Sequence, residues 1–204
     1  MKNFDFHFYK SNMFTIILAL FLVWAGNTFI PLYNGLSTAI AENLQSLGLL
    51  LIAVYSYFYA RRYPAQSANR IFWYWSVMWW IMLFGRGISW GRDFFPDVPH
   101  LYFRIISIIL IGLPVLMLFS KSIRQQIKHR FFFEKIPVWH IILAFVFLGL
   151  SDIVEHHRSG ANLLLYVSEK QDLIEELIEI PCFISLILIV LYMQRNERNI
   201  NQSK

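Results

Sequence analysis

The sequence predicts an all-α, polytopic transmembrane helix bundle, from its composition, the length of its apolar runs and its lack of a disulfide framework. Hydrophobic residues make up 57% of the 204 residues and charged residues only 15%, whereas a soluble domain has roughly 45–50% and about 25%. The apolar residues gather in runs of roughly 20, the length that crosses a bilayer core of about 30 Å. Cys182 is the only cysteine, which excludes a disulfide scaffold. The same composition excludes a soluble globular domain, a disordered chain and, despite a net charge of +5, a nucleic-acid-binding domain.

Six apolar segments are expected to cross the membrane and to form a single integral membrane domain over residues 1–204. The first follows Lys2 and Lys10, as a signal peptide would, but its run is too long for one and no small-residue cleavage site follows it. The third begins with Trp and Tyr residues, which suit a membrane interface, and the fifth is long enough only if it continues to Glu155. No strand pattern appears, and helices satisfy every backbone group within lipid. The expected spans are 13–33, 36–60, 71–90, 101–119, 136–155 and 173–193.

The distribution of basic residues predicts the orientation. Thirteen Lys and Arg residues fall on the side of the N-terminus and five on the other, whereas only three of the thirteen acidic residues lie on the N-terminal side. The positive-inside rule therefore predicts that both termini are cytoplasmic. We interpret the basic loops as topology signals that touch anionic lipid, so membrane lipid is an expected partner and nucleic acid is not. The expected location is a bacterial inner (plasma) membrane.

Polar residues gather at the outer ends of five of the six expected helices. Arg86, Ser89 and Asp93 are separated by three and four residues, and Asp152 and His156 are four apart. Residues so spaced share one face of a helix. Ionisable groups in a span usually face the bundle interior or a water-filled cavity. The candidate site residues are Glu42, Arg86, Asp152, His156, Glu176 and Glu179.

Arg86 is the residue for which a partner is most needed, because it lies about one turn inside the end of its helix. A buried guanidinium requires a carboxylate, and we expect Glu179 first, then Glu42 or Asp152. The pair could be a structural clamp or part of a functional site, and both alternatives stay open. Glu175 opens the sixth span, where the helix dipole alone favours an acidic residue.

A divalent metal ion is the one cofactor that these outer residues could hold. Zinc takes His nitrogen and carboxylate oxygen, and a catalytic zinc keeps one open position. The metal would lower the pKa of a bound water, and a spare carboxylate such as Glu176 or Glu42 could act as a general base. The candidate ligands are Asp152, Glu155, His156 and Glu179.

The end of the third span carries a motif, Gly85-Arg86-Gly87-Ile88-Ser89-Trp90-Gly91-Arg92. It resembles the Gly-Arg/Glu-Glu-Ile-Ser-Trp-Gly-Arg/Gln signature of a family of small bacterial polytopic membrane proteins. Those proteins also have a carboxylate in an early helix and an acidic late helix, to which Glu42 and the segment 175–179 would correspond. This sequence departs from the signature at Gly87, where an acidic residue is common. The family has no established activity, so the resemblance implies an architecture and no function.

These observations lead to an expected function of an intramembrane hydrolase or transferase that acts on a lipid or envelope substrate. A proton, cation or small-solute transporter and a non-catalytic membrane subunit are the alternatives. A transporter needs polar residues through its full depth, whereas the cytoplasmic half offers only His140, Ser185 and basic flanks. A one-sided site therefore favours an outward-facing enzyme.

Overall fold

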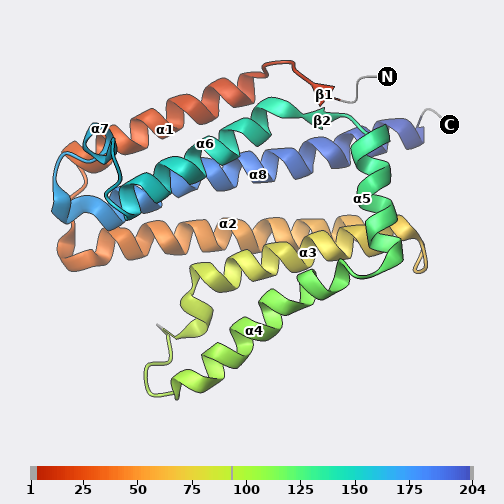
Figure 1. Ribbon diagram of the computed structural model, residues 1–204, viewed down its shortest axis with the longest axis horizontal. Coiled ribbons are helices and arrows are strands. Elements are labelled where there is room, and N and C mark those ends of the chain that lie inside the picture. The colour runs from red at the N-terminus through yellow and green to blue at the C-terminus, as the bar shows by residue number, and fades with distance from the viewer. Residues whose placement is uncertain (1–3, 93, 203–204) are drawn as a thin grey trace. The chain divides into compact units, whose positions relative to one another are not determined.

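The computed structural model describes residues 4–92 and 94–202, and this part of the chain is almost entirely helical (Figure 1). The predicted all-α class is confirmed. The long helices are α1 (Lys10–Thr28), α2 (Leu36–Ala60), α3 (Ala68–Gly87), α4 (His100–Met117), α5 (Lys121–Phe133), α6 (Val138–Glu155) and α8 (Gln171–Gln202). The short elements are strands β1 (Phe4–Asp5) and β2 (Ile136–Pro137), helix α7 (Ala161–Leu164) and 3-10 turns at Tyr33–Gly35, Ser89–Gly91 and Ser168–Lys170.

Within residues 4–92 and 94–202, four helices are long and apolar enough to cross a membrane, which indicates a membrane protein. They are α1, α2 together with the turn before it, α4 and α6. On α4, only Phe103 and Pro114 are buried, so most of this apolar helix is available to lipid. The expected spans 71–90 and 173–193 correspond to α3 and α8, which are outside this group of four. Trp, Tyr and polar residues lower the mean hydropathy of α3, whereas residues 177–194 of α8 are an apolar stretch in which Glu179 is the one charged residue.

Three segments differ from what the sequence led us to expect. Residues 121–133, expected as a basic loop, form α5, because no Gly or Pro interrupts them. β1 and β2 form a short parallel pair, in which Phe4 lies beside Ile136 and Asp5 beside Pro137, although no strand was expected. α8 continues to Gln202, beyond the expected end at residue 193.

The packing divides the chain into two compact units. The first unit comprises Met1–Ala41 and Glu134–Lys204, and the second comprises Glu42–Phe133. The boundary falls inside α2. Each unit is considered separately below.

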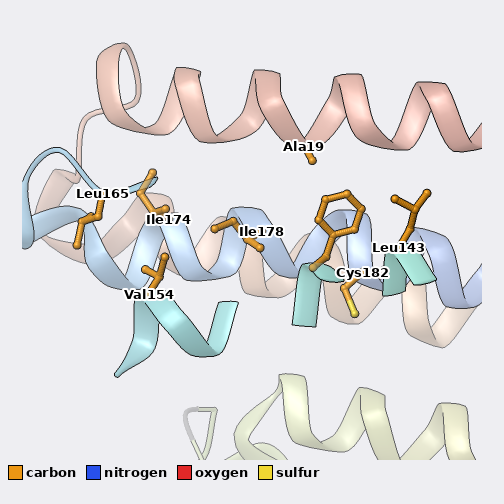
Figure 2. Packing of buried hydrophobic residues seen from close by; sticks show 8 residues of the cluster. Ala19, Leu143, Val154, Leu165, Ile174, Ile178 and Cys182 are labelled. Carbon is orange, nitrogen blue, oxygen red and sulfur yellow. The ribbon is translucent and has the colours of Figure 1, made fainter. Parts of the chain in front are cut away.

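In the first unit, α8 packs against both α1 and α6 (Figure 1). Buried apolar side chains from these three helices, together with Leu165 after α7, form its core, and α8 contributes residues spaced four apart, as one helix face requires (Figure 2). Gly26 lets α1 approach α8 closely, because a Cβ at this position would lie 2.6 Å from Cδ1 of Leu177. The core residues are Ala19, Leu143, Phe147, Val154, Leu165, Ile174, Ile178 and Cys182.

The C-terminal end of α1 is closed by Lys170. Its Nζ donates hydrogen bonds to the carbonyls of Gly26, Asn27 and Ile30 at 2.8, 3.1 and 2.9 Å. The last carbonyls of a helix have no partner within the helix, and a cation there also interacts well with the helix dipole. Lys170 therefore ties the turn before α8 to the end of α1.

In the second unit, α3 packs against α4 and α5. Nε1 of Trp75 donates to the carbonyl of Pro114 at 2.9 Å, which satisfies one of the last carbonyls of α4. Arg130 of α5 is buried, and its guanidinium lies 4.1 Å from the centre of the Phe72 ring. This cation–π contact shows that at least one basic residue of the 121–133 segment packs inside the protein.

Candidate functional site

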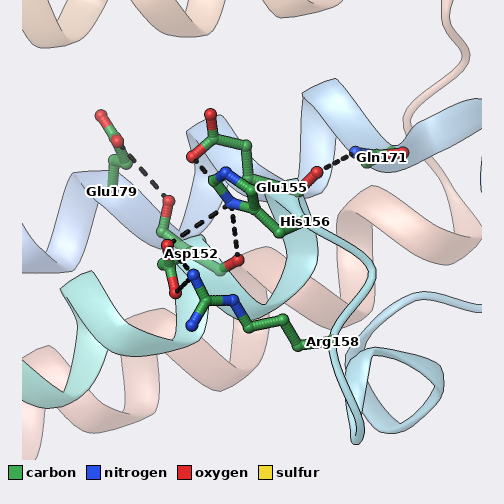
Figure 3. Close-up of polar contacts among 7 residues, drawn as sticks. Asp152, Glu155, His156, Arg158, Gln171 and Glu179 are labelled. Atoms are coloured by element: carbon green, nitrogen blue, oxygen red, sulfur yellow. Dashed lines mark hydrogen bonds and ion pairs between the residues drawn. The ribbon is translucent and has the colours of Figure 1, made fainter.

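The last turn of α6 gathers three of the residues that the sequence singled out (Figure 3). Nδ1 of His156 lies 3.4 Å from Oδ1 of Asp152 and 3.6 Å from Oε2 of Glu155. The side chains are about half exposed, at 53% for His156, 41% for Asp152 and 51% for Glu155. Their spacing on one helix brings them together, and we call these three residues the outer cluster.

Residues from the following loop and from α8 surround the outer cluster (Figure 3). Nη2 of Arg158 lies 3.1 Å from each carboxylate oxygen of Asp152. Nε2 of Gln171 donates to the main-chain carbonyl of Glu155 at 2.7 Å. Glu179 accepts a 3.5 Å hydrogen bond from the buried hydroxyl of Ser151, which places this carboxylate at the same end of α6. Glu176, one turn earlier on α8, is partly buried.

The outer cluster has the donor types that a divalent cation needs. Asp152, Glu155 and His156 each offer one ligand atom, and these atoms lie within 4.8 Å of one another. Two carboxylates and an imidazole suit zinc or a similar ion. Arg158, however, already places a positive charge on both oxygens of Asp152. A metal ion would therefore have to displace that guanidinium, and the role of these residues as ligands stays a prediction.

Glu42 and Arg86 belong to the second unit, whereas Asp152, His156, Glu176 and Glu179 belong to the first. Arg86 is exposed at the end of α3, and Glu42 is partly buried on α2. Asp93, expected on the face of Arg86, lies outside the described residues. The expected pairing of Arg86 with a carboxylate stays a prediction.

The motif that ends α3 has a packing role. Ser89, Trp90 and Gly91 all adopt positive φ angles of 48°, 59° and 93°, so the chain turns back sharply. The turn lays the Trp90 ring over Gly85, where a Cβ would lie 2.7 Å from the ring. A Cβ at Gly87 would lie 2.4 Å from the hydroxyl of Ser46. The two glycines therefore make room for neighbouring side chains.

A second polar cluster lies at the opposite end of α6, and the sequence reasoning missed it. The pairing of β1 with β2 holds Asp5 close to the beginning of α6. One carboxylate oxygen of Asp5 accepts hydrogen bonds from the hydroxyls of Tyr9, at 2.5 Å, and Tyr192 of α8. The other accepts the amide N–H of His7 at 2.9 Å. Asp5 thus joins the N-terminal segment to α8.

These contacts fix the charge state of Asp5. Burial by itself raises the pKa of this carboxyl, but the hydrogen bonds from Tyr192, Tyr9 and the amide of His7, together with the charge of Lys135, lower it to about 2. Hydrogen bonds to the ionised form favour that form. The bond to Asp5 and burial also raise the pKa of Tyr9. At neutral pH, Asp5 is ionised and Tyr9 keeps its proton.

His140, in the first turn of α6, forms the buried wall of this cluster. Its Nδ1 lies 2.7 Å from Nδ2 of Asn12, and its Nε2 lies 3.2 Å from Oγ of Ser11. Oδ1 of Asn12 accepts the amide N–H of Tyr9 at 2.8 Å, which fixes the orientation of the Asn12 amide. Nδ2 of Asn12 must therefore donate to Nδ1 of His140, so a neutral imidazole carries its proton on Nε2 and donates it to Ser11.

This tautomer excludes one obvious chemistry. A serine nucleophile needs a histidine whose ring nitrogen accepts the hydroxyl proton. In the Ser11–His140 pair, Nε2 already carries a proton, because Asn12 donates to the other nitrogen. The trio is therefore a hydrogen-bonded structural group that lacks the base of a nucleophilic triad.

A cavity of about 460 Å³ opens beside this wall, and we call it the N-terminal pocket. The N-terminal segment, the residue before β2, the beginning of α6 and the last part of α8 form it. Two cations, Lys135 and Arg195, and one ionised carboxylate, Asp5, line it. The other lining residues are Tyr9, Ser11, His140, Leu188, Leu191, Tyr192 and Asn196.

One pattern in the sequence could have indicated the N-terminal pocket. Asn12 and Thr15 are three residues apart near the start of the first apolar run, and His140 lies at the same depth in another. Polar residues one turn inside two spans are expected to face each other. Asp5, Tyr9 and Lys135 carry no such signal, since they lie in short polar flanks.

No protein-family model, curated protein or solved structure matches the chain. The resemblance of residues 85–92 to a membrane-protein signature stays a prediction.

Proposed function

We propose that this chain is a membrane protein that binds an anionic phospholipid through the N-terminal pocket. One observation carries the proposal: two cations lie beside a buried, hydrogen-bonded polar wall in a cavity of about 460 Å³. Phosphate is the common anionic group of membrane lipids, and basic pockets between membrane helices on the cytoplasmic side bind such head groups.

The charges of the N-terminal pocket support an anionic ligand. Asp5 is the one acid in its lining, so two positive charges face one negative charge, and two hydroxyls and an amide already occupy the oxygens of Asp5. Within residues 4–92 and 94–202, no hydrogen bond or ion pair holds the charged groups of Lys135 or Arg195. The amide of Asn196 lies near Tyr192, yet its buried Nδ2 has no acceptor in hydrogen-bonding geometry among these residues. The oxygens of a phosphate group would accept hydrogen bonds from Lys135, Arg195 and the amide of Asn196.

The expected topology puts the N-terminal pocket at the cytoplasmic surface of the membrane, the side on which basic pockets bind lipid head groups. We propose six spans, α1, α2, α3, α4, α6 and α8, with both termini in the cytoplasm of a cell that has an inner membrane. The excess of basic residues on the terminal side supports this orientation. A reporter enzyme that is active only in the periplasm should be silent when fused after Lys204 and active when inserted at Gly160. The opposite pattern would move the pocket to the outer surface.

The binding proposal is tested with hexanoyl glycerol phosphate, a water-soluble anionic lipid, added below its critical micelle concentration to protein held in amphipol. Each basic residue near an anionic surface contributes about 1 kcal/mol, so Lys135→Ala with Arg195→Ala should weaken binding about 30-fold. Arg124→Ala with Lys128→Ala removes two exposed cations of α5 and serves as the control. Equal losses of affinity in both double variants would show that binding depends only on the net charge of the protein, and would overturn the proposal.

The outer cluster supports a second candidate function, a metal-assisted hydrolase or transferase acting on a lipid or envelope substrate. The grouping of its three ligand atoms within 4.8 Å favours this candidate. Glu176 and Glu179 of α8 would supply further carboxylates. If a divalent ion binds here, His156→Ala should abolish stoichiometric zinc binding. Arg158→Gln should strengthen it, because the competing cation on Asp152 is gone. Zinc binding that neither variant alters would exclude this site.

A further inference from the structure

The first unit also contains an apolar cavity of about 410 Å³ between α1 and α6. Its lining is almost wholly hydrocarbon. Side chains spaced three and four residues apart on α1 form one wall, α6 forms the other, and α8 supplies the floor. We call this cavity the apolar groove. Its central lining residues are Ile16, Leu20 and Val23 of α1, Val146 and Leu150 of α6, and Ile178 of α8.

The apolar groove continues the line of the N-terminal pocket along the same three helices. On α6, His140 lines the pocket and Leu143, one turn later, lines the groove. On α1, the change from Ser11 to Ile16 takes five residues, or about 7.5 Å. On α8, the pocket uses Leu188 and the groove uses Ile178. Along α1 and α6 the lining is therefore polar at Ser11 and His140, beside the pocket that Lys135 and Arg195 line, and apolar from Ile16 and Leu143 onward.

The apolar groove is accessible from the hydrocarbon layer. α1 and α6 are two of the four helices that are long and apolar enough to cross a membrane. Leu20 and Val146, one on each wall, are exposed on the surface. From His140 to Leu150 the distance along α6 is about 15 Å, and the groove continues to Leu163 and Leu164 beside the C-terminal end of α1.

We infer that the apolar groove holds an acyl chain of the same lipid whose phosphate occupies the N-terminal pocket. This inference rests on the proposed function and specifies its ligand as a phospholipid bound by both head group and chain. The cationic pocket binds the phosphate, and the groove receives the acyl chain. The far end of the groove, at Leu163 and Leu164, lies beside the C-terminal end of α1, about 24 Å along that helix from Ser11, so only a long acyl chain would reach it.

The test compares glycerol phosphates that carry butanoyl, hexanoyl and octanoyl chains, each below its critical micelle concentration, with protein in amphipol. Each buried methylene should raise the affinity about fourfold, the equivalent of about 0.8 kcal/mol, so two more carbons should give about 16-fold. Val146→Trp narrows the groove at an exposed position and should remove this dependence on chain length. It should leave the affinity for glycerol 3-phosphate unchanged. Val115→Trp, at an exposed position of α4, is the matched control.

The possible outcomes separate the two proposals. Chain-length dependence that persists in Val146→Trp would overturn the groove assignment, while loss of phosphate binding in the Lys135→Ala, Arg195→Ala variant would still support the pocket. If Lys135→Ala with Arg195→Ala leaves the affinity for the acyl glycerol phosphates unchanged, the proposed function and this inference are both overturned.

A second measurement keeps the inference testable if Val146→Trp fails to fold. An octanoyl glycerol phosphate with a diazirine at the chain end should label the wild-type protein around Leu20 and residues 146–150, which line the groove nearer to the pocket. Labelling confined to α4 would contradict the assignment. A photoreactive residue placed at position 146 that crosslinks a second copy of the chain would assign the groove to a protein contact, and would also overturn the inference.

Discussion

Removing the Asn12 side chain is expected to loosen the N-terminal pocket and the beginning of α1 together. Asn12 is fully buried, and its amide makes two hydrogen bonds that no neighbour could replace. Oδ1 accepts the N–H of Tyr9, the residue before the helix, and Nδ2 donates to Nδ1 of His140. Asn12→Ala breaks both bonds and leaves a buried ring nitrogen of His140 without a donor.

The expected loss of stability follows from these two bonds. A lost side-chain cap costs about 1 kcal/mol, within a range of about 0.5–2. A buried polar atom left without a partner costs a further 1–3 kcal/mol, approximately. Asn12→Ala should therefore destabilise the first unit by about 2–4 kcal/mol. For a chain of this length, that loss lowers the melting temperature by about 5–15 °C.

The assay combines thermal melting in detergent with hydrogen–deuterium exchange of residues 4–20, which reports on the N-terminal segment directly. Asn162→Ala, at an exposed position of α7, is the control and should change neither measurement. If Asn12→Ala melts like the wild type and its N-terminal segment exchanges no faster, the hydrogen bonds of Asn12 contribute nothing to the stability of the first unit, and the prediction is wrong.

Asn12→Asp tests the assigned tautomer of His140 by a different route. A carboxylate still accepts the N–H of Tyr9, but it cannot donate to Nδ1 of His140. The imidazole should then move its proton to Nδ1, and Nε2 should accept from Ser11. Nitrogen chemical shifts of the ring distinguish a bare nitrogen from an N–H, and His140→Gln identifies the signal. A wild-type protein that already carries Nδ1–H would refute the tautomer argument.

Three further predictions concern stability. Asp5→Asn should cost about 1 kcal/mol at neutral pH, because the ordinary pKa of 3.8 falls to about 2 on folding and solvent screens part of the benefit. This contribution is present above pH 4 and disappears as the pH falls through about 2, so melting curves of wild type and variant should converge in acid. Lys170→Met should cost about 1–3 kcal/mol, since three carbonyls at the end of α1 lose their donor; Lys170→Arg should recover part of the melting temperature. Gly26→Val should cost about 1–3 kcal/mol by forcing α1 away from Leu177, whereas Gly149→Ala, with open space around it, should melt within about 2 °C of wild type.

Much of the architecture is encoded in local sequence. The length of the apolar runs predicts the long helices, because crossing a bilayer core requires about 20 apolar residues. Most helix boundaries lie within a few residues of the expected ones. α1, however, ends five residues early, before Pro31, because proline cannot continue a helix, and α8 continues nine residues beyond its expected end. The outer cluster is equally local: Asp152 and His156 lie four residues apart on one helix, so their meeting needs no other part of the chain.

The N-terminal pocket depends on the tertiary structure alone. Asp5 meets Tyr192 across 187 residues, and Asn12 meets His140 across 128. Spacing within a helix shows which residues share a face, but it does not show which face of another helix they will meet. The rotation of α1, α6 and α8 about their axes decides that, and it follows from how their side chains interlock. The short strand pairing that carries Asp5 to α6 has no periodic pattern in two residues. The sequence by itself therefore determined the class of protein and its local clusters, and only packing across more than a hundred residues determined where a ligand could bind.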